Sequence, residues 1–252
     1  VLGVELHGTT DGGVSWNPVT PPWWQYIVHA DMHDLIFDND DLYLATDGGL
    51  YSADKFNLNW LDIENIPVTQ FYHVATRDIE PGVYYGGAQD NGTTGGNSGN
   101  INSWPRIFGG DGFDVQFHPN NANIFYATTQ NGGLVYTDDG GSNFFDGTSG
   151  IDSDDRRNWD APFKISYHDP SQLFAGTYRL YTSIGSTSPF WSPASNDLTD
   201  GVIFGNNFHT ISVIEDSKID PNTLFVGTSD GNVWRSTDLG GNWTNITGTL
   251  PN

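Results

Sequence analysis

Apolar and polar residues alternate along many short segments of this chain, and no segment shows a convincing helical periodicity. Clear examples are Phe113, Val115 and Phe117, and again Ile211 and Val213. Alternation of this kind places one face of a strand against a core and the other toward solvent. Gly, Asn and Asp residues, which favour tight turns, separate the segments. The pattern predicts an all-β protein.

The alternating segments recur in five similar stretches. Each has a first strand, an acidic or Asn/Pro turn, a second strand ending in Gly, Ala or Thr, a glycine turn and a third strand. A period of about 40–50 residues with three or four strands is typical of a β-propeller blade. A β-sandwich is the alternative, but it does not explain the phased repeat. The first strands begin near His33, Phe71, Phe113, Phe163 and His209, at offsets of 38, 42, 50 and 46 residues.

We therefore expect one β-propeller of four-stranded antiparallel blades over residues 1–252, with blades starting near residues 31, 70, 111, 160 and 208. The stretch 87–104 is rich in Gly, Asn and Ser, and we expect it to be an inserted loop in the second complete blade. Packing between blades is expected for Trp16, Trp60, Trp234 and Trp243. Trp23, Trp24, Trp104 and Trp191 are expected in loops or at strand ends, where an exposed indole can stack on sugar or protein.

Two copies of the motif S/T-x-D-x-G-x-x-W lie near the two ends of the chain. The aspartate can accept turn N–H groups, the glycine permits positive φ, and the tryptophan can pack between blades. These features predict a structural role and not a catalytic one. A degraded copy has Asp138 and Gly140, with Phe144 displaced by one position, and Ser52, Asp54 and Trp60 form a weaker one. The two full copies are Thr9, Asp11, Gly13 and Trp16, and Ser236, Asp238, Gly240 and Trp243.

This motif resembles the Asp-box, or BNR repeat, of sialidase-like propellers. The segments "LYLATDGGLYSAD", "VYYGGAQDNGT" and "HPNNANIFYATTQNGG" are similar to large secreted propellers, which include xyloglucan hydrolases, the sortilin luminal domain and a photosystem assembly factor. They look closest to exported repeat proteins of Bacteroidota. The resemblance implies an extracellular, cell-surface or periplasmic protein. It also implies that the chain begins mid-blade and holds five and a half blades of a six- or seven-bladed parent.

Composition narrows the classes of partner. The 252 residues include 9 Lys and Arg against 31 Asp and Glu, for a formal net charge of −22. Such a balance disfavours nucleic acid and anionic membrane surfaces, since phosphate-rich partners need a basic surface. Direct membrane insertion is not expected either, because no apolar run approaches the roughly 20 residues that span a bilayer. The absence of cysteine excludes disulfides and thiol chemistry. The acidity indicates either a solubilised surface or Ca²⁺ binding at acidic loops such as Asp38–Asp41 and Asp152–Asp155, neither of which has EF-hand spacing.

In a propeller the innermost strands line an axial channel, and their entrances form one face. This topology gathers carboxylates and imidazoles at one mouth. Two acids about 5–10 Å apart can hydrolyse a glycosidic bond, and Asp31 with Asp111 is the pair we would test. The same residue types can hold a divalent cation, or can simply line a wet channel. The remaining mouth residues are His33, Asp34, Tyr72, Asp114, Trp159, Asp160, Asn207 and His209.

These observations favour a non-catalytic module that binds a protein or polysaccharide partner, as part of a larger chain or assembly. The alternative is a polysaccharide hydrolase resembling the xyloglucanases, with Asp31 and Asp111 as acid and base. Sialidase activity is disfavoured, because arginines are few and the Arg-Ile-Pro sequence of that family is missing.

Overall fold

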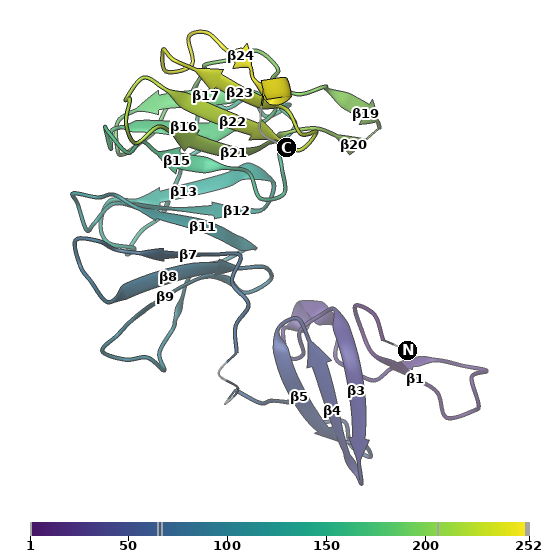
Figure 1. The fold of residues 1–252 in the computed structure, drawn as a ribbon. Coiled ribbons are helices and arrows are strands. Elements are labelled where there is room, and N and C mark those ends of the chain that lie inside the picture. Colours follow the sequence, from purple (N-terminus) through teal and green to yellow (C-terminus); the bar gives the residue numbers. More distant parts are fainter. Residues whose placement is uncertain (1, 65, 67, 206, 250–252) are drawn as a thin grey trace. The chain divides into compact units, whose positions relative to one another are not determined.

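The computed structural model describes residues 2–64, 66, 68–205 and 207–249, without the side chains of residues 207 and 249. The chain divides into two compact units, Val1–Thr69 and Gln70–Asn252, and each is described by itself (Figure 1). Regular structure in the described residues is β-strand apart from three short 3₁₀ turns. Among these residues no helix has both the length and the apolar character needed to cross a bilayer.

The N-terminal unit consists of a short hairpin and one four-stranded meander. Its strands surround a small apolar core that includes Leu6, Val28, Leu44 and Trp60. The Trp60 indole donates a hydrogen bond of 3.0 Å to the Val19 carbonyl oxygen and so ties the meander to the hairpin. The elements are β1 (His7–Gly8), β2 (Asn17–Pro18), the 3₁₀ turn Trp23–Gln25, β3 (Met32–Asp38), β4 (Asp41–Thr46), β5 (Gly49–Asp54) and β6 (Leu61–Asp62).

The second unit contains four consecutive four-stranded antiparallel sheets, in which strands adjacent in sequence pair with each other. A separate hairpin, β19 (Val202–Phe204) with β20 (Asn207–Phe208), precedes the last sheet. The sheets are β7 (His73–Thr76), β8 (Val83–Ala88), β9 (Gly92–Asn97) and β10 (Arg106–Phe108); β11 (Gly112–Phe117), β12 (Phe125–Thr129), β13 (Gly133–Thr137) and β14 (Phe145–Asp146); β15 (Phe163–Ile165), β16 (Gln172–Gly176), β17 (Leu180–Ile184) and β18 (Ser192–Pro193); and β21 (Ile211–Asp216), β22 (Leu224–Thr228), β23 (Val233–Ser236) and β24 (Thr244–Asn245).

Successive sheets of the second unit pack face to face. The first strand of each sheet lies next to the first strand of the following one, so that β7, β11, β15 and β21 are neighbours (Figure 1). Apolar side chains fill the spaces between sheets. For example, the rings of Tyr126 and Phe163 lie 4.9 Å apart, and Phe174 belongs to the same cluster as Leu224. This arrangement confirms the predicted all-β class of four-stranded antiparallel blades.

The S/T-x-D-x-G-x-x-W motif forms the same turn in three places. In the turn after β13, the Thr137 hydroxyl donates to Asp139 at 2.9 Å and accepts from the N–H of Gly141 at 3.0 Å. The backbone and side-chain amides of Asn143 both donate to the Asp139 carboxylate. These hydrogen bonds, those from Asn143 foremost, lower the pKa of Asp139 to about 2.

The expected register of the degraded copy was wrong. Asp139, and not Asp138, receives the turn hydrogen bonds, so the motif runs through Thr137, Asp139, Gly141 and Phe144 with unaltered spacing and Phe in place of Trp. Consecutive Asp and Gly pairs made the two registers look alike in sequence. Asp11 and Asp238 accept hydrogen bonds in the same pattern, which lowers the pKa of both.

The tryptophans of the two full motifs have different environments. Trp243 packs against the cluster between the last two sheets, and its indole donates to the Ala194 carbonyl oxygen at 3.0 Å. Trp16, which was expected between blades, is 48% exposed. Among the described residues of the N-terminal unit, the β1–β2 hairpin has a sheet on one side only, so this indole has no second sheet to pack against. Trp191 lies directly before β18, at a strand end as expected, but its indole is buried and not exposed.

The glycine-rich stretch 87–104 was also misjudged as an inserted loop. It holds the end of β8 and all of β9, which are hydrogen-bonded blade strands. A Cβ atom at Gly87 would lie 2.1 Å from the backbone oxygen of Phe113, and one at Gly96 would lie 2.6 Å from the Trp104 ring. The glycines are therefore present because neighbouring groups approach the strand closely.

One of the three motif turns carries a strained residue. Leu239 has a φ of 55°, whereas the equivalent positions in the other turns are Gly12 and Gly140, with φ of 74° and 77°. Left-handed backbone costs a residue with a Cβ roughly 1–2 kcal/mol, partly offset by the greater chain entropy of glycine. We expect Leu239→Gly to raise the free energy of unfolding by about 0.5 kcal/mol in urea denaturation.

Gly140→Ala is the matched control. A Cβ at Gly140 would lie 3.6 Å from Asn123 Oδ1, an ordinary contact, so that the expected loss of about 1 kcal/mol arises from backbone strain alone. A destabilised Leu239→Gly variant would show that the side chain contributes more by packing than its backbone loses by strain.

Candidate functional site

One end of the second unit presents a row of aromatic rings. The row comes from residues just before or at the start of the first strands of three successive sheets. Tyr72 and Phe113 have ring centroids 4.9 Å apart at 70°, and Phe113 and Trp159 are 5.9 Å apart at 82°. Phe113 is completely buried, while Tyr72 is 48% and Trp159 42% exposed. Two exposed rings are thus held on a buried one; we call this surface the mouth row.

Polar contacts join distant segments beside the mouth row. His73 Nε2 lies 2.8 Å from Asp160 Oδ2, with 46% and 30% of the two side chains exposed. These residues are 87 positions apart and belong to sheets separated by a third. The Tyr72 hydroxyl donates to Gln89 Oε1 at 2.8 Å, which fixes the orientation of the exposed phenol.

Asp111 links two neighbouring blades. Its carboxylate accepts the backbone N–H of Asp90 at 2.7 Å, and its own N–H donates to Gln130 Oε1 at 2.9 Å. Asp90 lies in the β8–β9 turn, while Gln130 follows β12. The carboxylate proposed as half of a catalytic pair therefore holds a turn in place.

Asp114 is engaged in a similar link between first strands. The Gln116 amide donates to Asp114 Oδ2 and to the Phe163 carbonyl oxygen, both at 2.7 Å. Gln116 Oε1 in turn accepts the backbone N–H of Ile165 at 2.9 Å. The Gln116 side chain thus forms hydrogen bonds with the Phe163 carbonyl oxygen and the Ile165 N–H at the edge of β15, where these groups would otherwise lack a strand partner.

The last blade contributes Asp230, which sequence reasoning did not single out. Its carboxylate accepts the Thr228 hydroxyl and the backbone N–H of Asp200, the latter at 2.5 Å. Burial opposes ionisation of Asp230, but these hydrogen bonds and the charge of His209 outweigh it and lower the pKa. His209 precedes β21, and its N–H donates to the Gly201 carbonyl oxygen. Asn207 pairs through its backbone in β20, away from the start of β21, and its side chain lies outside the described residues.

A buried network of charged and polar side chains involves the segment that connects the second and third blades of this unit. Asp155 accepts from Arg179 Nε at 3.0 Å and Nη2 at 2.8 Å, from the Tyr181 hydroxyl at 2.7 Å and from the Thr177 hydroxyl at 2.9 Å. Only 3% of the Asp155 side chain is exposed. Asp155 belongs to the acidic segment Asp152–Asp155, which was considered above as a loop for Ca²⁺. Its carboxylate is bound by an arginine.

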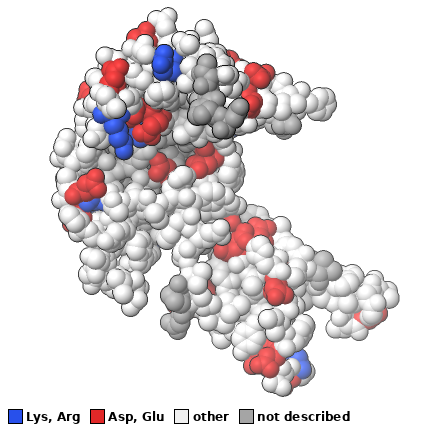
Figure 2. Space-filling view, in the orientation of Figure 1, with Lys and Arg blue, Asp and Glu red and all other residues white. Residues whose placement is uncertain are grey.

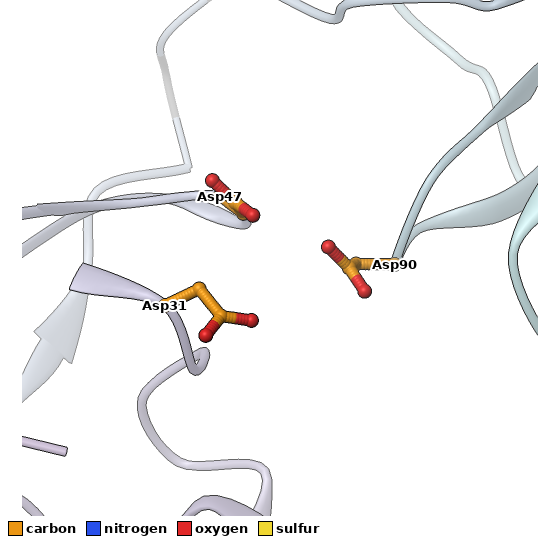
Figure 3. A group of neighbouring side chains, drawn as sticks. All are labelled: Asp31, Asp47 and Asp90. Carbon is orange, nitrogen blue, oxygen red and sulfur yellow. The ribbon is translucent and has the colours of Figure 1, made fainter. Parts of the chain in front are cut away.

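The N-terminal unit holds the other predicted mouth residues, Asp31, His33 and Asp34, and Figure 3 draws Asp31 with Asp47 of the same unit. Asp31, which has a φ of 58°, and Asp47, in the β4–β5 turn, have carboxylate oxygens within 4.8 Å of each other. His33 forms an ion pair with Asp47. The Asp34 carboxylate accepts the N–H of Leu35 at 2.9 Å. Figure 3 also draws Asp90, which belongs to the second unit, as does Asp111; the predicted pair of Asp31 and Asp111 thus comes from two separately described units.

Sequence reasoning missed the residues in the turns between second and third strands. In an antiparallel meander these turns lie at the same end of the sheet as the start of that sheet's own first strand. The signal was present in four of the five turns, since each of these four follows a strand ending in Ala, Gly or Thr with an Asp-Gly or Asn-Gly pair. The residues concerned are Asp47, Gln89, Asp90, Gln130 and Asp230, and His73 is a further omission at the start of β7.

Comparison with known proteins identifies the architecture. No protein-family model matches the chain, and no curated protein matches its sequence. A GH74 xyloglucanase from Xanthomonas campestris superposes with a TM-score of 0.54 at 14% identity, over 82% of this chain and 36% of the enzyme. Two extracellular domains of regulatory systems from B. thetaiotaomicron, one hybrid two-component and one one-component, give TM-scores of 0.52 and 0.51 at 11% and 14% identity. The fold is a β-propeller.

The extent of these matches limits what they convey. The two B. thetaiotaomicron comparisons cover 96% and 86% of this chain but 30% and 28% of the other chains. The chain therefore spans about a third of the length of these three structures. At these identities the likeness concerns blade architecture, and the chemistry of the mouth has to be argued from the propeller's own residues.

Proposed function

We propose that this propeller is an exported or cell-surface module that binds a protein or glycan partner at the mouth row and does not catalyse a reaction. One observation carries the proposal. Two half-exposed aromatic rings, Tyr72 and Trp159, are held on a buried third ring, while the carboxylates around them already serve as structural acceptors. Rigid exposed aromatics bind partners at small entropic cost.

The export of the protein rests on the sequence resemblance and on the extracellular neighbours.

The fold shared with a xyloglucanase makes polysaccharide hydrolysis the second candidate. We would incubate the purified chain with xyloglucan and other glucans, measure reducing-sugar release, and measure retention of the chain by electrophoresis through xyloglucan gels. We expect no sugar release. Turnover that disappears in Asp111→Ala or Asp31→Ala would overturn the proposal.

The location of binding is tested separately. Tyr72→Ala combined with Trp159→Ala is expected to weaken binding to xyloglucan or to a peptide array at least tenfold, since buried aromatic contacts contribute 1 kcal/mol or more each. Trp24→Ala is the matched control, because Trp24 is 59% exposed but belongs to the N-terminal unit.

A further inference from the structure

The second unit is strongly acidic, and it has few basic side chains that are not already in ion pairs. Residues 70–252 contain eight Lys and Arg against twenty Asp and Glu. Over the visible face in Figure 2, acidic side chains outnumber basic ones. Such a field attracts cationic ligands and repels anionic ones. Half of the eight basic side chains already form ion pairs, namely Arg77 with Glu80, Arg156 with Asp197, Lys164 with Glu215, and Arg179 with Asp155.

The mouth row adds a feature that cations recognise. Aromatic faces attract guanidinium and ammonium groups, more strongly when a carboxylate lies nearby and water is partly excluded. Trp159 is adjacent in sequence to Asp160, and Tyr72 is adjacent to His73, the partner of Asp160. The chain already makes the same contact internally, since the Arg156 guanidinium lies 4.2 Å from the centroid of the Tyr178 ring.

We infer that the partner of the mouth row is a cationic peptide segment, whose Arg or Lys side chains lie over Tyr72 and Trp159 and meet the Asp160 carboxylate. This inference rests on the proposed function and specifies the class of ligand. A neutral glucan can stack on the same rings, but it makes no use of the acidic field. Charge complementarity therefore favours the peptide.

The test uses the complete 252-residue chain and a fluorescein-labelled peptide, acetyl-Gly-Arg-Gly-Arg-Gly-amide, in anisotropy titrations at about 0.15 M salt. A peptide with citrulline in place of each arginine keeps the shape and removes the charge. We expect binding of the arginine peptide only. Tyr72→Leu with Trp159→Leu should weaken it about 5- to 30-fold, whereas Tyr72→Phe with Trp159→Phe should retain most of it.

A matched pair of charge variants separates the mouth from the general field. Asp160→Asn and Asp78→Asn each remove one negative charge, but Asp78 lies in the β7–β8 turn, at the opposite end of the sheet from His73. We expect several-fold weaker binding for Asp160→Asn and little change for Asp78→Asn. Equal losses, or equal binding of the citrulline peptide, would overturn the inference.

Glucan probes distinguish failure of the inference from failure of the proposed function. Titration with a neutral xyloglucan oligosaccharide is run on the same variants. In one outcome, the oligosaccharide binds the wild type and binds the Leu variant more weakly, while the arginine peptide does not bind. In that case the inferred ligand class is wrong, but the proposed function as a binding module is retained. If the oligosaccharide is cleaved, the proposed function itself is wrong. Absence of binding by the arginine peptide overturns the inference in every case.

Discussion

Asp155→Ala is expected to destabilise the second unit by about 3–5 kcal/mol, the usual cost of removing one partner from a buried ion pair. The carboxylate is the common acceptor for Arg179, Tyr181 and Thr177, and its side chain is 3% exposed. Its removal leaves the Arg179 guanidinium with Asp152, 3.5 Å away, and leaves the Tyr181 hydroxyl without its acceptor. The Thr177 hydroxyl keeps the Arg179 carbonyl oxygen as an acceptor at 3.2 Å. Urea denaturation followed by circular dichroism measures the loss.

Asp155→Asn and pH separate the charge of this residue from its shape. Burial opposes ionisation of Asp155, but hydrogen bonds from Arg179, Tyr181 and Thr177 outweigh it, so the pKa is lower in the folded chain than the value of about 3.9 in an unfolded chain. The stabilisation is therefore present above about pH 4 and is lost as the pH falls through the folded pKa. The stability difference between wild type and Asp155→Asn should shrink below about pH 4.

Asp197→Ala is the control for this prediction. Asp197 pairs with Arg156 at 2.6 Å, but 35% of its side chain is exposed, and exposed pairs contribute about 0–1 kcal/mol. If Asp155→Ala were no more destabilising than Asp197→Ala, the network around Asp155 would not be a stabilising element of the unit.

Trp191→Ala is expected to have an effect of similar size, about 3–5 kcal/mol, because it removes a fully buried indole. Trp191 belongs to the cluster between the second and third blades of this unit, with its ring 6.3 Å from that of Phe163. Its Nε1 donates to the Gly147 carbonyl oxygen at 2.6 Å. The substitution would open a cavity between two blades and leave that carbonyl without its donor.

Trp24→Ala is the comparison for Trp191→Ala. Trp24 is 59% exposed, and its removal should change the free energy of unfolding by less than about 0.5 kcal/mol. Both variants lose one tryptophan, so equal denaturation midpoints would contradict the assignment of Trp191 to the inter-blade core. Trp191→Phe keeps the ring but not the indole donor, and it separates packing from the hydrogen bond.

Local chemistry in the sequence determined the blade pattern. Strand alternation at Phe113–Phe117, glycines at turns and the repeated S/T-x-D-x-G motif depend on interactions within a few residues, so they can be recognised without the tertiary structure. The same locality explains why the repeats predicted the observed class of four-stranded antiparallel sheets. The error at the degraded motif was a choice between two neighbouring aspartates, Asp138 and Asp139, which look alike in the local sequence.

Tertiary structure alone decided the environment of individual side chains. Gly87 and Gly96 lie in strands because backbone and rings from elsewhere approach them, although their local propensity indicates a loop. Trp16 and Trp243 have the same motif but different exposure, since burial depends on whether a neighbouring sheet is present. The pairs His73 with Asp160 and Arg179 with Asp155 join residues far apart in sequence or from different segments. Contacts between blades decide which carboxylates hold turns and which face a partner. The spacing of residues along the sequence does not reveal those contacts.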